Sequence, residues 1–405
     1  MNVKAGYVVA VLLFASVAGC GSSGGGGGGG GTSASDKSPI KIMSFFESTG
    51  VDALPLLPDG AQAAVAAVNK AGGINGRKLE WSSCDDKDTA ADARACAQQA
   101  VSSGAIAVVG SDSLQNGEYL PVLAAGHVAS FGSNPLQLGG DFTAPNSFPL
   151  EAGTASYPAA AGLTLLKLGA TTISLAAIDI GNNSLEVALN AGLAATGRKV
   201  QNFVQVPAGA PDQAPYVTAA LSGGTNGIVV WQQESDSINF LRQLSSSKNA
   251  KNTKVAVVSN DEAALFQQIG ALGYGVGEVF NSYPTNQVSI PAVAQEVANF
   301  QAAGVASALT DQDADNAYNA VMAFADIAKK VKDLTPASFM TAVEHTSDLH
   351  TGLLPPLQFE KGNVDGIGKA VYNNCSLLAD VTAQGVQLLD QQWVDPTTGM
   401  ACASP

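Results

Sequence analysis

The chain has 405 residues, of which 46% are hydrophobic, 13% charged and 6% aromatic. This composition predicts a folded α/β protein and excludes an intrinsically disordered chain, and the length allows two domains. The formal net charge of −14 argues against nucleic acid or an anionic membrane surface as the partner.

The amino terminus has the layout of an export signal. Residues 1–19 contain Lys4, the apolar run "YVVAVLLFASV" and then small residues, as in a secretory signal peptide. The run is too short to span a bilayer. The sequence "VAGC" at 17–20 resembles the lipobox of bacterial lipoproteins, and this resemblance implies cleavage before Cys20 and acylation of its thiol. The alternative is an ordinary cleaved signal peptide in which Cys20 has no role.

Residues 20–38 consist of Cys20, expected to carry the lipid, and a tether that is mostly glycine and serine. Such a segment cannot bury apolar surface, and as a random coil it reaches about 25 Å. We therefore expect an exported bacterial protein whose lipid anchor holds it to the outer face of the cell membrane or in the periplasm, with no other membrane contact.

From Ile40 onward, short β-branched segments alternate with helical patterns. Strands are predicted at 40–48, 77–84, 105–111 and 127–133, with helices at 58–72 and 89–104. A second series has strands at 171–179, 199–207, 227–233 and 254–260, with a helix at 235–247. This alternation predicts two doubly wound parallel sheets, with ligands bound beyond the carboxyl ends of the strands.

The segment "AGGINGRKLE" at 71–80 has a structural explanation of its own. Gly72, Gly73 and Gly76 can take the positive φ values needed to end a helix and turn into the next strand. We expect this segment to shape the fold without touching ligand.

Cys20 leaves four further cysteines in the exported part, Cys84, Cys96, Cys375 and Cys402. An exported compartment permits disulfides, and three pairings are formally possible. We favour the two local pairs, 84 with 96 and 375 with 402, the second around a hairpin-like segment. The competing interpretation, a zinc site, lacks a CxxC motif or a nearby histidine pair.

Several segments together resemble a known family. They are "IKIMSFFESTG", "AVNKAGGINGRKLEW", "CDDKDTAADARACAQQAV", "AIAVVGS", "GATTISLAAIDIGNNS", "NGIVVWQQESDSINFLRQL", "YNAVMAFADIAKK" and "GLLPPLQFEKGN". In this order they resemble the type I periplasmic binding proteins that serve ABC importers of branched-chain amino acids and related solutes. The resemblance covers essentially the whole chain after residue 38.

The resemblance implies two lobes joined by three crossovers, which close on a small molecule by hinge motion and deliver it to the permease subunits of an ABC transporter. It places lobe 1 at 39–153 plus 286–350 and lobe 2 at 154–285 plus 351–405. A monomer without metal or other cofactor is expected.

Amino-acid binders of this family hold the ligand carboxylate with small hydroxyl residues and backbone N–H groups of the first lobe. The matching positions here follow two predicted strands and are Ser111, Asp112, Ser113, Gly132, Ser133 and Asn134. The alternative is that the serines cap the helices that follow, and both roles can coexist. The charge of Asp112 departs from the pattern because it opposes a carboxylate.

The family binds the ligand's ammonium group with an acidic residue, and the matching position here is Asp261. The alternative is that Asp261 is a solvated loop residue. An acid expected at the lobe junction falls near Thr154, and two expected tyrosines fall at Asn183 and Gln233. An aromatic wall residue falls near Asp313. These departures make a plain aliphatic ligand doubtful and leave a polar amino acid, an amide or urea-like compound, or a small organic acid.

Four aromatic residues at or near strand ends are candidate pocket walls, with core packing as the alternative: Phe45, Phe46, Trp231 and Tyr283.

An enzyme and a surface receptor component are the two alternative functions. His127, His345 and His350 show no metal-ligand spacing, and the sequence has no nucleophile elbow, phosphate loop or dinucleotide fingerprint, so we do not expect an enzyme. A ligand-sensing surface receptor component would have the same fold and pocket, and no sequence feature separates it from a transport protein.

Overall fold

The structure is a computed structural model, and it describes residues 37–49, 53–136, 139–179, 181–250, 252–258, 276–361, 372–382 and 385–405. All of them belong to one compact unit, Lys37–Pro405. The predicted signal peptide, Cys20, most of the tether and Asp261 lie outside the described residues.

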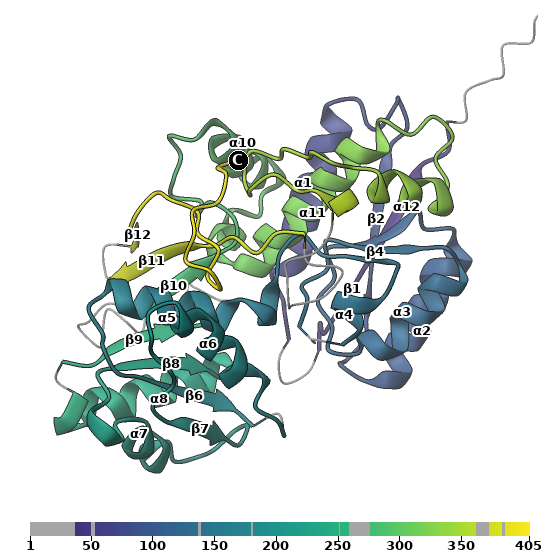
Figure 1. Cartoon of the computed structure of the whole chain (residues 1–405). Coiled ribbons are helices and arrows are strands. Elements are labelled where there is room, and N and C mark those ends of the chain that lie inside the picture. The colour runs from purple at the N-terminus through teal and green to yellow at the C-terminus, as the bar shows by residue number, and fades with distance from the viewer. Residues whose placement is uncertain are drawn as a thin grey trace, which may run out of the picture. The chain divides into compact units, whose positions relative to one another are not determined.

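The first sheet has five parallel strands in the order β2-β1-β3-β4-β5 (Figure 1). Their bounds are β1 Ile40–Phe46, β2 Leu79–Asp85, β3 Ala107–Val109, β4 Ala129–Phe131 and β5 Ser147–Phe148. The alternation of side chains along a strand sends Ile40, Ile42 and Phe46 to one face and Met43 and Phe45 to the other, and each face has its own buried core.

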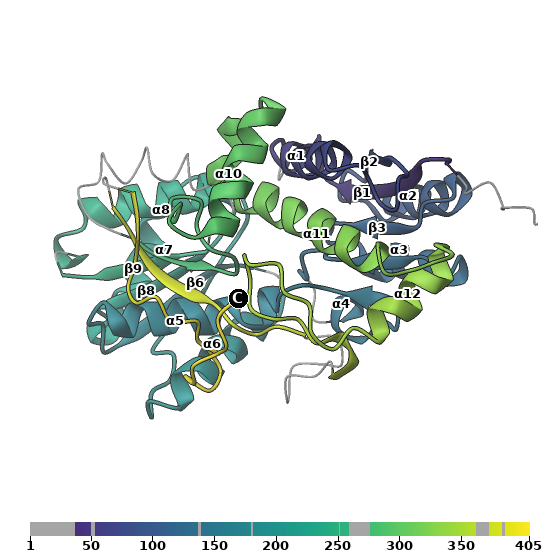
Figure 2. The same ribbon diagram turned by 90° about the horizontal axis from the view of Figure 1, so that it is seen from above.

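Helices from distant parts of the sequence cover the two faces. One face packs against α1 (Leu57–Lys70), α11 (Gln312–Ala328) and α12 (Pro336–Glu344), and α10 (Pro291–Ala303) packs on α1. Figure 2 shows the late helices α11 and α12 lying along this sheet. The other face packs against α2 (Ala90–Ser103) and α3 (Asn116–Ala125), and the one-turn α4 (Gly140–Thr143) precedes β5.

The second sheet has seven strands in the order β12-β11-β10-β9-β8-β6-β7. The strands are β6 Ile173–Ile178, β7 Phe203–Val206, β8 Gly227–Trp231, β9 Lys254–Val257, β10 Val276–Phe280, β11 Leu377–Thr382 and β12 Gly385–Leu388. Strands β6 to β10 pair in parallel, whereas β11 is antiparallel to β10 and β12 to β11. The prediction of two mainly parallel α/β sheets is confirmed, with an antiparallel hairpin at the end of the second.

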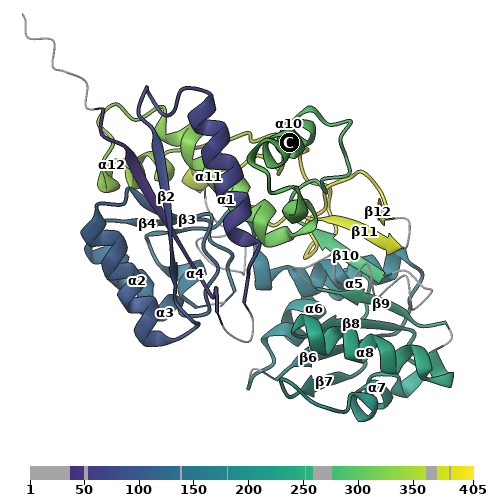
Figure 3. The same ribbon diagram turned by 180° about the vertical axis from the view of Figure 1, so that it is seen from behind.

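The second sheet is also covered on both faces. Helices α5 (Tyr157–Lys167) and α6 (Ser184–Ala194) bury one face, and α7 (Ala214–Ala220) and α8 (Glu234–Ser246) bury the other (Figure 3). The near-continuous apolar strands β6, β8 and β9 are those expected of a parallel sheet buried on both sides.

The glycine-rich turn after α1 behaves as the sequence predicts. Gly72, Gly73 and Gly76 have φ values of 102°, 76° and 80°. A Cβ on Gly73 would lie 2.1 Å from the carbonyl oxygen of Arg77, so the chain reverses there only with glycine. The side chain of Asn69 then bonds both the N–H and the C=O of Leu79, at 2.8 Å each, which fixes the start of β2.

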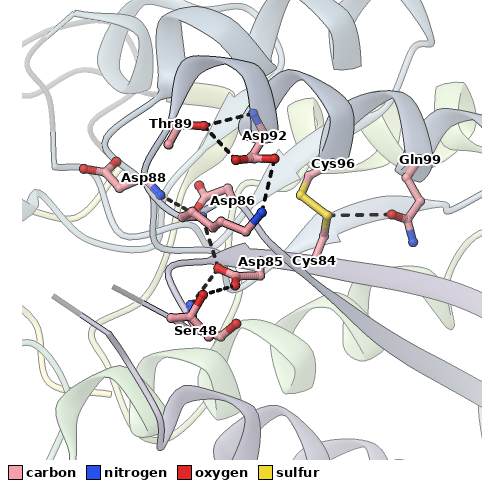
Figure 4. A network of polar contacts seen from close by, with 11 residues as sticks. Ser48, Cys84, Asp85, Asp86, Asp88, Thr89, Asp92, Cys96 and Gln99 are labelled. Atoms are coloured by element: carbon pink, nitrogen blue, oxygen red, sulfur yellow. Dashed lines mark hydrogen bonds and ion pairs between the residues drawn. A yellow bond between two sulfur atoms is a disulfide. The ribbon is translucent and has the colours of Figure 1, made fainter. Parts of the chain in front are cut away.

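Both predicted disulfide pairs are present, Cys84–Cys96 and Cys375–Cys402. The first joins β2 to α2 beside a network of acidic residues (Figure 4). There Asp85 accepts hydrogen bonds from the Ser48 N–H, the Thr49 hydroxyl and the Lys87 N–H, at 3.1, 2.5 and 3.1 Å. Thr89 caps α2 by accepting from the N–H of Asp92. The acidic "CDDKD" segment therefore ties the loops after β1 and β2 together.

Candidate functional site

The carboxyl ends of β3 and β4 present the polar residues predicted for the first lobe. Gly110 and Gly132 follow these strands with φ values of 61° and 66°. A Cβ on Gly132 would lie 2.5 Å from the Cβ of Ala320, so α11 packs directly on this turn. Gly110 faces Ala317 and Ala320 in the same way, so both loops are held close to the middle of α11.

The three predicted serines already have protein partners. Ser111 Oγ accepts from the N–H of Phe45 at 2.8 Å, and Ser113 Oγ accepts from the N–H of Gln115 at 3.2 Å, just before α3. Ser133 Oγ lies 2.7 Å from Ser130 Oγ. Ser111 and Ser133 thus bond to residues of β1 and β4 rather than cap a helix, and each hydroxyl keeps further hydrogen-bonding capacity.

Asn134 is positioned by its acidic neighbour. Its Nδ2 donates to Asp112 Oδ2 at 2.8 Å, and since Asp112 can only accept when ionised, the orientation of the amide is defined. The Oδ1 atom of Asn134 is buried and has no hydrogen-bond partner among the described residues. It is therefore an acceptor awaiting a donor.

Glu151 is the centre of the site, and the sequence analysis did not select it. It follows β5, is 4% exposed, and accepts at Oε2 from the hydroxyl of Tyr157 (2.8 Å) and from Asn281 Nδ2. Asn316 Nδ2 donates to Oε1 at 2.8 Å. Asn281 Nδ2 also contacts the Tyr157 hydroxyl, and Ser376 Oγ donates to Asn281 Oδ1.

The three donors come from α5, from the end of β10 and from α11. Burial raises the pKa of Glu151 to about 7, although the hydrogen bonds from Tyr157, Asn316 and Asn281 act against this rise. Burial, with the charge of Glu151, also raises the pKa of Tyr157 well above its ordinary value, so this phenol stays a donor.

These residues line one small pocket. Its carboxyl groups are Glu151, Asp313 and Asp315. The amide side chains that line it are Asn134, Asn281, Gln312 and Asn316, and the other described lining residues are Tyr157, Ser282 and Leu354. The structure thus brings Asn134 and Asp313, both singled out from the sequence, together with Glu151.

A second cavity of about 300 Å³ shares the walls Ser282, Gln312 and Asp315 with this pocket. Its apolar lining residues are Phe280, Tyr283, Leu309 and Val386. Of the aromatic wall candidates, Tyr283 lines this cavity, whereas Phe45 and Phe46 are fully buried in the two cores of the first sheet.

Other predicted site residues lie elsewhere. Thr154 Oγ1 donates to the carbonyl of Pro135 at 3.1 Å, which joins the β4 loop to the segment after β5. Asn183 is exposed before α6, and Gln233 is partly buried before α8. Its neighbour Gln232 is buried with both amide atoms lacking a partner in the described part of the chain. None of these four is among the described residues that line the two cavities.

The signal for Glu151 was present in the sequence. The family pattern places an acid at the lobe junction, and the match by position fell near Thr154 in "EAGTAS", whose first residue is Glu151. A shift of three residues separates the predicted position from the acid that the fold places in the pocket.

No helix among the described residues is long and apolar enough to cross a membrane. In the same part of the chain, no group of three or more histidine, cysteine, aspartate or glutamate side chains is arranged to hold a metal ion.

Two mainly parallel α/β sheets, with polar residues gathered at strand ends, match the fold of the type I periplasmic binding proteins. Residues 39–385 match the sequence profile of the family described as periplasmic binding protein. The chain therefore belongs to this family. Comparison with curated protein sequences gives no match.

Solved structures share the fold at low identity. A leucine-, isoleucine-, valine-, threonine- and alanine-binding protein from Brucella ovis, in a closed conformation, has a TM-score of 0.73 and 15% identity, covering 91% of this chain and 99% of that one. The branched-chain amino acid transporter substrate-binding protein LivJ from Streptococcus pneumoniae, in complex with isoleucine, has a TM-score of 0.68 and 19% identity, covering 86% of this chain and 98% of that one. A solute-binding protein from R. palustris, in complex with 4-hydroxybenzoate, has a TM-score of 0.67 and 16% identity, covering 86% of this chain and 95% of that one.

Proposed function

We propose that the protein is the extracytoplasmic substrate-binding lipoprotein of an ABC importer, which closes on a small polar solute and delivers it to a membrane permease. The observation that carries this is the buried polar pocket around Glu151 in a chain of the periplasmic binding protein family. Binding proteins of this fold take an aliphatic amino acid in one case and an aromatic acid in another, so the pocket must supply the specificity.

The lobes proposed from the sequence are 39–153 plus 286–350 and 154–285 plus 351–405. The strands of the two sheets fall on either side of this division. Leu353, Leu354 and Phe359 pack into the core of the first sheet. We therefore place the last boundary of the proposed division after Lys361.

The binding function is tested by a thermal-shift screen of the full chain against amino acids, amides, ureas and small organic acids, because a ligand that binds only the native state raises the unfolding temperature. Asp261→Ala is expected to weaken binding of the ligand so found without lowering the unfolding temperature of the free protein. Unchanged affinity would remove Asp261 from the proposed site.

The proposed anchor is tested by fractionation. Cys20→Ala should release the protein from the membrane fraction, because the variant lacks the thiol to which the anchoring acyl chain would be attached. Retention of the variant in membranes would contradict lipid anchoring. Size-exclusion chromatography with light scattering tests the proposed monomer.

A further inference from the structure

We propose that the pocket around Glu151 takes an organic cation, a primary amine or a guanidinium compound, and that the ligand needs no carboxylate. This inference rests on the proposed binding function and narrows it to one chemical class.

The first observation is the charge of the walls. Glu151, from the segment after β5, meets Asp313 and Asp315, from the first turn of α11, at one pocket, and no lysine, arginine or histidine is among its described lining residues. An organic acid would bring a further negative charge into this place, where burial makes charge repulsion strong. A cation is the complementary ligand.

The second observation is independent of charge. Asn134 is 5% exposed and lines the pocket, and its Oδ1 is a buried acceptor without a partner in the described part of the chain. Its Nδ2 is committed to Asp112, so the free side of the amide can only accept. A buried unsatisfied acceptor is costly, and an N–H of an ammonium or guanidinium group would satisfy it.

The third observation concerns Glu151 itself. A carboxylate has about four acceptor positions, and three of them are filled by Tyr157, Asn281 and Asn316. All three donors are neutral, so they fix the direction of the carboxylate without cancelling its charge. One acceptor position and the charge remain for a ligand.

Of the positions expected to hold a carboxylate, only Asn134 is among the described residues that line this pocket, and the three serines are not. Ser111, Ser113 and Ser133 are bonded to Phe45, Gln115 and Ser130. Asp112, between the first two serines and almost fully buried, opposes an anion. The adjoining cavity of about 300 Å³, with apolar walls at Phe280, Leu309 and Val386, gives room for the body of the ligand.

The test uses matched triplets of compounds and the full chain. Each triplet has an amino acid, the amine obtained by removing its carboxylate, and the acid obtained by removing its amine: leucine, isoamylamine and isocaproate; arginine, agmatine and 5-guanidinovalerate. Titration calorimetry at pH 8 should show binding by at least one decarboxylated cation. Isocaproate, which has a carboxylate and no cationic group, should not bind.

Binding by amino acids or acids alone would overturn the cation proposal and leave the binding function standing. Binding by none of the compounds would also overturn it, and mass spectrometry of solutes released from the natively purified protein would then decide the binding function separately.

The variant Asn134→Ala should lower the affinity for the cation about 10- to 100-fold, as expected for a lost hydrogen bond to a charged group. Asn239→Ala, at an exposed position of α8, is the matched control and should change affinity less than twofold. If Asn134→Ala unfolds, Asp313→Asn provides the second variant, with a similar loss expected. Unchanged cation affinity in a folded variant would contradict the assignment.

Discussion

At the scale of single residues, the pocket depends on side chains that meet only in the folded chain. The sequence supplied Asn134, because polar residues after strands mark the ligand-binding edge of a parallel sheet. Asp313 came from the family resemblance, as the position of an aromatic wall residue. The family pattern also placed an acid three residues from Glu151, but the sequence could not show the donors to Glu151, which lie 6, 130 and 165 residues further along the chain. Such long-range contacts leave no local pattern.

The first prediction at this scale concerns pH. The pKa of Glu151 is about 7, so a proton competes with a cationic ligand below this pH. Affinity for an amine should fall by up to about tenfold per pH unit between pH 7 and 5.5, where the amine itself stays charged. The other ionisable groups facing Glu151 are Tyr157, which stays neutral, and Asp313 and Asp315.

Calorimetry at pH 5.5, 6.5, 7.5 and 8.5 measures this dependence. Glu151→Gln should bind the amine weakly at every pH and lose the dependence on pH. A wild-type affinity that is equal at pH 5.5 and 8.5 would show that Glu151 does not contact the charge.

A second residue, Glu296 of α10, gives a prediction on stability. Glu296 is 0% exposed and interacts with Asp315 of α11, and burial followed by the charge of Asp315 raises its pKa well above the ordinary value. The folded state then binds a proton that the unfolded state releases near pH 4.3. The free energy of unfolding should therefore decrease as pH rises above about 5.

Urea unfolding of Glu296→Gln between pH 5 and 8 should show a flatter dependence on pH than the wild type. The control is Glu344→Gln, at an exposed position of α12. If the Glu296 variant keeps the wild-type slope, the carboxyl group does not hold the proton.

At the scale of elements, the sequence predicted most strands and helices, because apolar periodicity, turn glycines and N-caps act locally. The family resemblance assigned 286–350 to lobe 1, but local sequence patterns did not show that α11 and α12 of this segment cover the first sheet beside α1. That packing depends on complementary surfaces between elements far apart in sequence. The antiparallel pairing of β11 with β10 is likewise a tertiary choice, although the hairpin at the chain end was expected.

The contact between α1 and α11 gives the prediction at this scale. A Cβ on Gly60 would lie 1.7 Å from the carbonyl oxygen of Ala314, so the two helix backbones touch there. Gly60→Ala should lower the free energy of unfolding by about 1–3 kcal/mol or more, because backbone must move. Gly117→Ala in α3, where a Cβ meets nothing within 4 Å, should instead raise it by about 0.5–1 kcal/mol.

Chemical unfolding of both variants checks the pair. The two substitutions remove the same backbone freedom from the unfolded chain, so their difference measures the helix contact alone. Equal effects would mean that α1 and α11 can separate at no cost.

At the scale of the whole molecule, the family was predicted from many weak segments spread along the chain, and the match over residues 39–385 confirms it. The two disulfides constrain different parts of the chain. Cys375–Cys402 closes a loop with a separation of 27 and holds the final segment, with the buried Trp393, against β11. Cys84–Cys96 closes a separation of 12 within the first sheet and its helix.

Replacing Cys375 and Cys402 by serine should reduce the free energy of unfolding by about 3–4 kcal/mol. Replacing Cys84 and Cys96 should reduce it by somewhat less, because their disulfide closes a shorter loop and restricts the unfolded chain less. Denaturant unfolding of both double variants provides the comparison. A larger loss from the shorter loop would point to native-state packing as the main source of stabilisation.

The contact between Tyr157 and Trp231 should allow ligand binding to be followed by tryptophan fluorescence. Of its three tryptophans, Trp81 donates to Ser44 in the first sheet and Trp393 is fully buried, whereas the Trp231 ring lies 6.1 Å from the ring of Tyr157, whose hydroxyl donates to Glu151. A solute that engages Glu151 should therefore change the emission of Trp231. Trp231→Phe should abolish the fluorescence response, and Trp81→Phe should keep it, so the unlabelled protein can serve as a sensor for its own ligand.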